Sequence, residues 1–181
     1  DRRQRQMCIR DRLKEAKGSE SALARFNART ERLERVEEPA SVSGIRPLNI
    51  QQQMAFNLLL DDSLALVTLV GKAGTGKTLL ALAAGLKKAL TEERFSRVLV
   101  ARPVIPMGRD IGYLPGAKTE KLANWMQPVF DNLEYILSAD KRLRDLTIDQ
   151  LISRRLIEIK ALTYIRGRSL PNQFIIIDEA Q

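Results

Sequence analysis

A glycine-rich segment that ends in Lys and Thr has the residue types needed to hold a polyphosphate. Residues 71–78 read GKAGTGKT and fit the Walker A pattern of Gly, four residues, Gly, Lys and Ser or Thr. The glycines let successive backbone N–H groups point into one concavity, and a following helix adds its positive N-terminal end. We therefore expect the phosphates to be bound by Gly71, Lys72, Ala73, Gly74, Thr75, Gly76, Lys77 and Thr78.

Two of these residues carry side chains with chemical roles. Lys77 would bring a positive charge to the β and γ phosphates, which makes it a candidate catalytic residue. The hydroxyl of Thr78 would be a ligand of Mg²⁺. The cofactors predicted from this segment are therefore ATP and Mg²⁺.

A second acidic motif follows about a hundred residues later, where the apolar run Phe174 to Ile177 ends in Asp178 and Glu179. A carboxylate at the carboxyl end of a buried strand can hold Mg²⁺, so Asp178 is the predicted metal ligand, as in Walker B. The chain contains no His, so Glu179 is the candidate base that orients and deprotonates water. Alone the motif is weak, because Asp is also an ordinary N-cap, but downstream of a phosphate loop the catalytic interpretation is favoured.

The pattern around these motifs predicts alternating helices and strands. Asn49 is a candidate N-cap, and Thr147 with Gln150 forms a candidate capping box. The predicted elements are helices from Ile50 to about Leu60, Lys77 to about Leu90, Leu122 to Leu137 with a bend at Pro128, and Thr147 to about Arg155, and strands at Leu64 to Val70, Arg97 to Ala101, Leu156 to Leu162 and Phe174 to Asp178. This order predicts an α/β fold with a mostly parallel sheet flanked by helices.

Composition narrows the class of protein. The 181 residues contain 44% hydrophobic and 29% charged residues, which is ordinary for a globular domain. The longest apolar run is far too short to cross a bilayer, the first dozen residues lack the apolar core of a signal peptide, and the single Cys8 excludes an internal disulfide. We expect a cytoplasmic protein with no membrane partner. The net charge of +8 fits either a polyanionic partner or a merely basic surface.

Domain organisation is predicted from the change in pattern near residue 45. Residues 1–45 are rich in Arg and Glu without a sustained heptad, and we expect a charged, partly disordered linker with some helix. The first dozen residues match no defensible structural pattern and could be foreign to the native domain. Residues 46–181 would be the ATPase domain.

Several segments resemble known ATPases. The Glu beside the Mg²⁺ aspartate resembles the hydrolytic, RecA-like and helicase-like branch of P-loop proteins, which implies hydrolysis of ATP to ADP and phosphate. Leu48 to Gln52 resembles the adenine-recognition motif of superfamily 1 helicases, which implies that Gln52 reads the adenine edge. The alternative for Gln52 is a polar helix start.

A more specific resemblance is to the PhoH family of ATPases, over about residues 46–181. It is carried by GKAGTGKT together with Arg102-Pro103, Gly108, Ile111 to Gly116, Glu120-Lys121 and Asp178 to Gln181. The chain is most similar to the branch in which a PIN-type nuclease domain precedes the ATPase, and a homo-oligomeric ring is also implied. No spaced carboxylates of a PIN metal site occur in the sequence, so nuclease activity is not expected of this chain.

The resemblance also implies that such ATPases continue beyond Gln181 with a sensor strand and an Arg. The fold would then be incomplete at the C-terminus, with a vacant slot at the centre of the sheet between Leu64 to Val70 and Phe174 to Ile177. Exposed apolar edges of this kind invite mispairing, so we expect the 181-residue piece alone to be poorly stable.

Basic residues raise the question of a nucleic-acid partner. Arg102, Arg109 and Lys118 follow the second predicted strand, where superfamily 1 helicases touch single strands, and a second group comprises Arg154, Arg155, Lys160, Arg166 and Arg168. Tyr113, Trp125 and Tyr164 could offer stacking faces, although Trp125 fits the core. Three functions stay open: an ATPase coupled to binding or unwinding of single-stranded RNA beside a PIN nuclease, an ATP-dependent switch or chaperone-like ATPase without nucleic acid, and a nucleotide-binding module without turnover.

Overall fold

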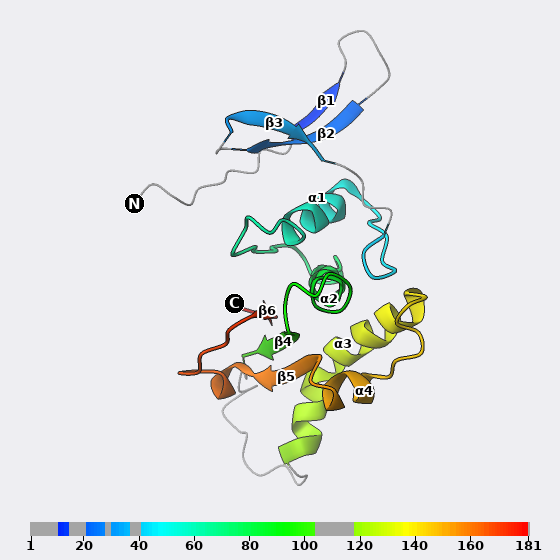
Figure 1. The fold of residues 1–181 in the computed structure, drawn as a ribbon, viewed down its shortest axis with the longest axis vertical. Coiled ribbons are helices and arrows are strands. Elements are labelled where there is room, and N and C mark those ends of the chain that lie inside the picture. The colour runs from blue at the N-terminus through cyan, green and yellow to red at the C-terminus, as the bar shows by residue number, and fades with distance from the viewer. Residues whose placement is uncertain (1–10, 15–20, 28–29, 37–40, 104–117, 181) are drawn as a thin grey trace.

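The protein contains two separate three-stranded sheets, seen in a computed structural model that describes residues 11–14, 21–27, 30–36, 41–103 and 118–180 (Figure 1). The first sheet is antiparallel and comprises β1 (Asp11–Lys14), β2 (Ser21–Asn27) and β3 (Arg32–Arg35). The second sheet is parallel, in the order β5-β4-β6, and comprises β4 (Arg97–Arg102), β5 (Ile157–Ala161) and β6 (Gln173–Ile177).

The parallel sheet positions the carboxyl ends of its strands along one edge. Val98 in β4 pairs with Ile157 on one side and Phe174 on the other. Residues 98–101 are fully buried, as expected for a central strand covered on both faces. The alternation of helices and strands and the parallel pairing confirm the predicted α/β fold.

Within the described residues, four α-helices accompany this sheet. They are α1 (Ile50–Leu59), α2 (Lys77–Leu86), α3 (Lys118–Ala139) and α4 (Ile148–Ser153), with a π-helical turn at Lys87–Thr91 and a 3₁₀ turn at Leu162–Tyr164. The two predicted caps are confirmed, because the side chain of Asn49 accepts a hydrogen bond from the Gln52 N–H and Thr147 makes a complete capping box with Gln150. None of the helices in the described ranges is long and apolar enough to cross a bilayer.

The hydrophobic core lies between α2, α3 and the parallel sheet. Helix α3 buries Met126, Val129, Leu133 and Ile136 on one face, which confirms the predicted apolar stripe. Helix α2 buries Leu82 and Leu86. Because Gly85 has no side chain, α2 can approach β6 closely: a Cβ at this position would lie 2.9 Å from Cδ1 of Phe174.

The predicted strand from Leu64 to Val70 is wrong in this structure, which has no strand there. Leu66 is 84% exposed and Val70 is 90% exposed. An apolar run becomes a strand only when a neighbour satisfies its backbone groups, and β4 already pairs with β5 and β6 on its two sides. In the described part of the sheet β6 pairs with β4 alone, and Ile175 and Ile177 of β6 are exposed. The predicted vacant slot and its cause beyond Gln181 stay predictions.

The N-terminal segment also differs from expectation, since its described residues form β1, β2 and β3 instead of a linker with some helix. The strands bury Ala24, and Val36 just after β3 is buried too. Arg25 of β2 forms an ion pair with Asp61, which follows α1. Residues 1–10 lie outside the described ranges, and the predicted domain boundary at residue 45 stays a prediction.

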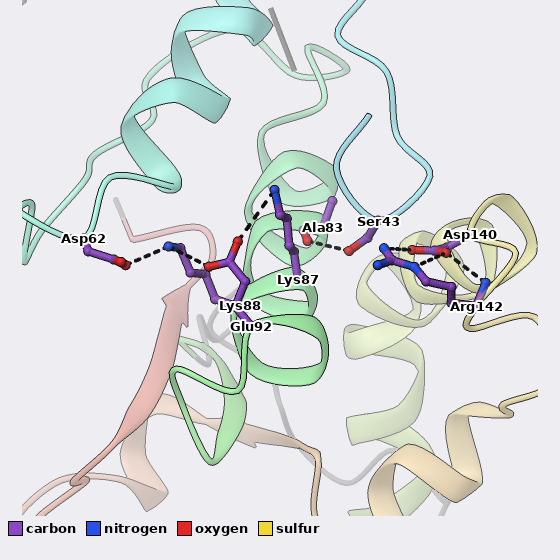
Figure 2. A network of polar contacts seen from close by, with 8 residues as sticks. All are labelled: Ser43, Asp62, Ala83, Lys87, Lys88, Glu92, Asp140 and Arg142. Atoms are coloured by element: carbon purple, nitrogen blue, oxygen red, sulfur yellow. Dashed lines mark hydrogen bonds and ion pairs between the residues drawn. The ribbon is translucent and has the colours of Figure 1, made fainter. Parts of the chain in front are cut away.

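A buried lysine ties the C-terminal end of α2 to the chain that leads into residues 64–70 (Figure 2). Nζ of Lys88 lies 2.7 Å from Asp62 Oδ1 and 2.9 Å from Glu92 Oε2. Burial opposes the charge of Lys88, but its hydrogen bonds to Asp62 and Glu92 prevail and raise its pKa. Nearby, the hydroxyl of Ser43 donates to the carbonyl of Ala83 in α2 at 3.0 Å. These contacts hold the residues that flank the segment 71–78, with Asp62 before it and Ala83 and Lys88 after it.

Candidate active site

The glycine-rich segment forms an exposed loop that runs directly into α2. Gly74 and Gly76 have φ angles of +75° and +84°, in the left-handed region that side chains disfavour. Gly76 is also the N-cap of α2, so the loop and the positive end of the helix share one concavity. The structure thus brings Gly71, Lys72, Ala73, Gly74, Thr75, Gly76, Lys77 and Thr78 together around it.

The ammonium group of Lys77 lies over the loop itself. Its Nζ donates to the carbonyl of Gly71 at 2.8 Å and to that of Lys72 at 2.9 Å. The hydroxyl of Thr75 donates to the same Lys72 carbonyl at 2.9 Å. These bonds hold the loop closed around a positive charge, which is an arrangement suited to an anion.

Thr78 and Asp178 meet although they are a hundred residues apart. The hydroxyl of Thr78 in the first turn of α2 donates to Oδ1 of Asp178 at 2.8 Å. Asp178 directly follows β6, and its N–H donates to the Ala101 carbonyl at 2.9 Å, which extends the ladder with β4. The close approach of α2 to β6 at Gly85 makes this meeting possible.

Glu179 has an unusual backbone conformation for its residue type. Its φ angle is 53°, so it is a non-glycine residue in the left-handed region. Such conformations cost on the order of 1 kcal/mol or more and concentrate at functional sites. The side chain is half exposed, beside Arg102.

Arg102 is a residue of this site whose role was not predicted. The sequence placed it among residues that contact single strands, but its side chain is only 11% exposed and lies beside the two acidic residues. Nε lies 3.3 Å from Asp178 Oδ2, and Nη2 lies 3.6 Å from Glu179 Oε1. The role of Arg102 could have been predicted from its position at the end of the central strand, next to the end of β6 that carries the acidic pair.

Gln52 connects α1 to the phosphate loop. Its Oε1 accepts from the Leu48 N–H at 2.8 Å, and its Nε2 donates to the Thr75 carbonyl at 3.2 Å. Gln52 also lines a pocket of about 240 Å³ with Gly76 of the loop and Tyr135 of α3. A larger hollow of about 490 Å³ lies at the amino ends of the strands, beside Ser96 and Leu156, and is therefore remote from this chemistry.

The second basic group is split between the two ends of β5. Arg154 and Arg155 precede the strand, whereas Arg166 and Arg168 follow it in the connection to β6, and all four are exposed. Lys160 pairs with Glu158 within the strand. Exposed Tyr164 accompanies the pair that follows β5. Arg109 and Tyr113 lie outside the described residues, as does the side chain of Lys118, and Trp125 packs against the core as predicted.

Comparison with known proteins gives a consistent result. The family model for PhoH, described as PhoH-like protein, matches residues 44–181. The chain is 58% identical to Protein PhoH2 of Bacillus subtilis over 139 residues, which cover 76% of this chain and 31% of that protein. It is 44% identical to Protein PhoH2 of Mycolicibacterium smegmatis over 165 residues, which cover 91% of this chain and 36% of that protein.

A PhoH-like protein of Mycobacterium leprae is 34% identical over 137 residues, which cover 76% of this chain and 37% of the relative. The chain thus spans about a third of the length of these relatives. The family model covers well over half of the chain, and its residues coincide with the unit that carries the phosphate loop and the acidic pair. The chain therefore belongs to the PhoH family of P-loop NTPases.

Proposed function

We propose that this chain binds ATP with Mg²⁺ and hydrolyses it to ADP and phosphate. The observation that carries this proposal is the 2.8 Å hydrogen bond between Thr78 and Asp178, because it joins the glycine-rich loop to the acidic pair. A nucleotide on the loop would place its terminal phosphates beside both acids.

The side chains at this point fit Mg²⁺. A hydroxyl oxygen and a carboxylate oxygen lie 2.8 Å apart, and Mg²⁺ prefers oxygen ligands and keeps several waters. Thr78 and Asp178 would therefore hold the ion, which would neutralise charge on the phosphates.

The remaining roles follow from position. Lys77 would exchange its bonds to the carbonyls of Gly71 and Lys72 for the β and γ phosphates. Glu179 would orient and deprotonate the attacking water, and its left-handed backbone supports a position selected for chemistry over stability. The transfer itself requires positioning more than covalent help.

Gln52 is proposed to read the adenine edge. Its amide retains one N–H and one lone pair after the bonds to Leu48 and Thr75, so it can still pair with a base. The pocket beside it contains Tyr135, which offers an aromatic face, and Gly76, which adjoins the phosphates.

Coupling to single-stranded RNA is the second part of the proposal. Tyr164, Arg166 and Arg168 are exposed in the connection between β5 and β6 and combine a stacking face with positive charge. In this proposal the chain works in the cytoplasm, in a homo-oligomeric ring and beside a PIN nuclease domain. The alternative is an ATP-dependent switch or chaperone-like ATPase that uses no nucleic acid.

The test is phosphate release from ATP and Mg²⁺ by the full-length protein, with and without single-stranded RNA. Lys77→Ala and Glu179→Gln should abolish turnover, whereas Lys87→Ala, in the π-helical turn that follows α2, should not. RNA stimulation that is lost in the Arg166→Gln, Arg168→Gln double variant supports RNA coupling. Turnover indifferent to RNA favours the switch, and turnover that survives both Lys77→Ala and Glu179→Gln would refute the site assignment.

For the RNA arm the chain offers a matched control. Arg154→Gln combined with Arg155→Gln removes the same charge from the exposed residues that precede β5. Equal losses of RNA stimulation in both double variants would indicate a general effect of charge, and not a contact made by the connection between β5 and β6.

A further inference from the structure

Arg102 lies between the acidic pair and α3. It is the last residue of β4, and its side chain is almost fully enclosed. An arginine in such a place must find partners for its charge, because an unpaired buried cation is costly. Its partners on the two sides have different chemistry.

On the side of the acidic pair the contact is electrostatic. The guanidinium approaches Asp178 at 3.3 Å and Glu179 at 3.6 Å, yet its buried Nε has no hydrogen-bond partner of good geometry. Oδ1 of the same Asp178 already accepts the hydroxyl of Thr78. The two oxygens of Asp178 are thus divided between Thr78 and Arg102.

On the other side Arg102 is anchored to α3. Its Nη1 donates to the backbone carbonyl of Trp125 at 2.7 Å, and its guanidinium carbon lies 5.5 Å from the centre of the Trp125 ring. The first is a charge-assisted hydrogen bond and the second has the geometry of a cation–π contact. Trp125 is the only tryptophan of the sequence, so this contact has its own optical signal.

We propose that Arg102 is the positioning residue of the acidic pair: it holds Asp178 and Glu179 until the metal binds, and then yields Asp178 to the metal while it keeps Glu179 oriented. This inference rests on the proposed function. Two neighbouring carboxylates repel each other without a cation, and Arg102 supplies one from the protein. Because Arg102 and Mg²⁺ are both attracted to Asp178, they compete.

The competition gives a signature that a merely structural role lacks. Arg102→Gln should reduce kcat by about ten- to a hundredfold, because Glu179 loses its orientation. The same change should lower the Mg²⁺ concentration that half-saturates ADP binding by several fold, because a competing cation is gone. Affinity for ADP without Mg²⁺ should change little. Arg102→Lys restores the positive charge but not the planar guanidinium. It should therefore return the half-saturating Mg²⁺ concentration to the wild-type value without restoring kcat.

The experiment uses the full-length protein and calorimetric titration with ADP over a range of Mg²⁺ concentrations, beside steady-state turnover. Arg97→Gln is the matched control, since Arg97 lies at the other end of β4 and pairs with Glu158. It should alter neither kcat nor the Mg²⁺ requirement. Tryptophan emission is recorded in parallel, and the Trp125→Phe variant identifies the signal of Trp125.

With wild-type protein, Mg²⁺ and ADP together should change the Trp125 emission, and this change should disappear in Arg102→Gln. If Arg102→Gln binds ADP with an unchanged or raised Mg²⁺ requirement, Arg102 is not a competitor and the inference fails while the proposed function stands. If wild-type protein binds no ADP at any Mg²⁺ concentration, the proposed function itself fails, and the inference fails with it.

Discussion

The cluster around Lys88 predicts an asymmetric response to substitution (Figure 2). The Lys88 side chain is 5% exposed, whereas Asp62 and Glu92 are 46% and 31% exposed. Removing both carboxylates with Asp62→Asn and Glu92→Gln would leave a buried cation with weaker partners, which costs about 3–5 kcal/mol. Lys88→Met removes the buried charge and keeps the apolar stem, so it should cost about 1 kcal/mol or less.

Asp62 and Glu92 also have partners other than Lys88, and these contacts decide what the carboxylate substitutions cost when Lys88 is absent. Asp62 also pairs with Arg94 at 3.3 Å, and Glu92 pairs with Lys87 at 3.6 Å. These are surface contacts worth roughly 0–1 kcal/mol each. In a Lys88→Met background the two carboxylate substitutions together should therefore cost no more than about 1–2 kcal/mol.

Native-state hydrogen exchange of the full-length protein measures these differences locally, in peptides that cover residues 77–91. This readout reports local opening and needs no two-state assumption. The reasoning would be refuted if Lys88→Met destabilised α2 more than the double carboxylate variant, or if the carboxylate substitutions cost the same in both backgrounds.

Three further predictions concern stability and the approach of α2 to β6. Arg142 hydrogen-bonds Asp140 and lowers the pKa of its carboxyl group from 3.8. The ionised carboxylate therefore stabilises the folded state above pH 3.8, and this contribution is lost as the pH falls through the lower pKa of the folded state. Asp140→Asn should therefore weaken the dependence of the melting temperature on pH in the acid range, and an unchanged dependence would contradict this. Gly85→Val should push α2 from Phe174 and weaken Mg²⁺-dependent ADP binding more than Mg²⁺-free binding, with partial rescue by Phe174→Leu. Thr147→Ala removes a complete capping box and should cost about 0.5–2 kcal/mol by denaturant unfolding, whereas Thr147→Ser should be nearly neutral.

The parts of the fold that sequence predicts well are those with local causes. Asn49 and Thr147 cap helices through bonds within their own first turn, so short patterns suffice to find them. The meeting of Thr78 and Asp178 agrees with the two sequence motifs, because both side chains were expected to be ligands of the same Mg²⁺. Both interpretations depend on rules that need no knowledge of distant side chains.

The parts that escaped prediction depend on partners elsewhere in the chain. Leu64 to Val70 has the composition of a buried strand, but pairing requires a neighbour with free backbone groups. Arg102 stands in a sequence that suits an exposed cation, and only the packing of α3 shows that it points inward. The N-terminal strands have weak local patterns and take their form from one another.

The left-handed backbone of Glu179 has a consequence for engineering. Gly or Asn adopts such a conformation more readily than Glu, so Glu179→Gly or Glu179→Asn removes strain of on the order of 1 kcal/mol. A library screened for heat resistance alone would therefore enrich these replacements and discard the side chain proposed as the base. Thermal survival and turnover would then diverge at this one position, and a selection for useful variants has to demand both at once.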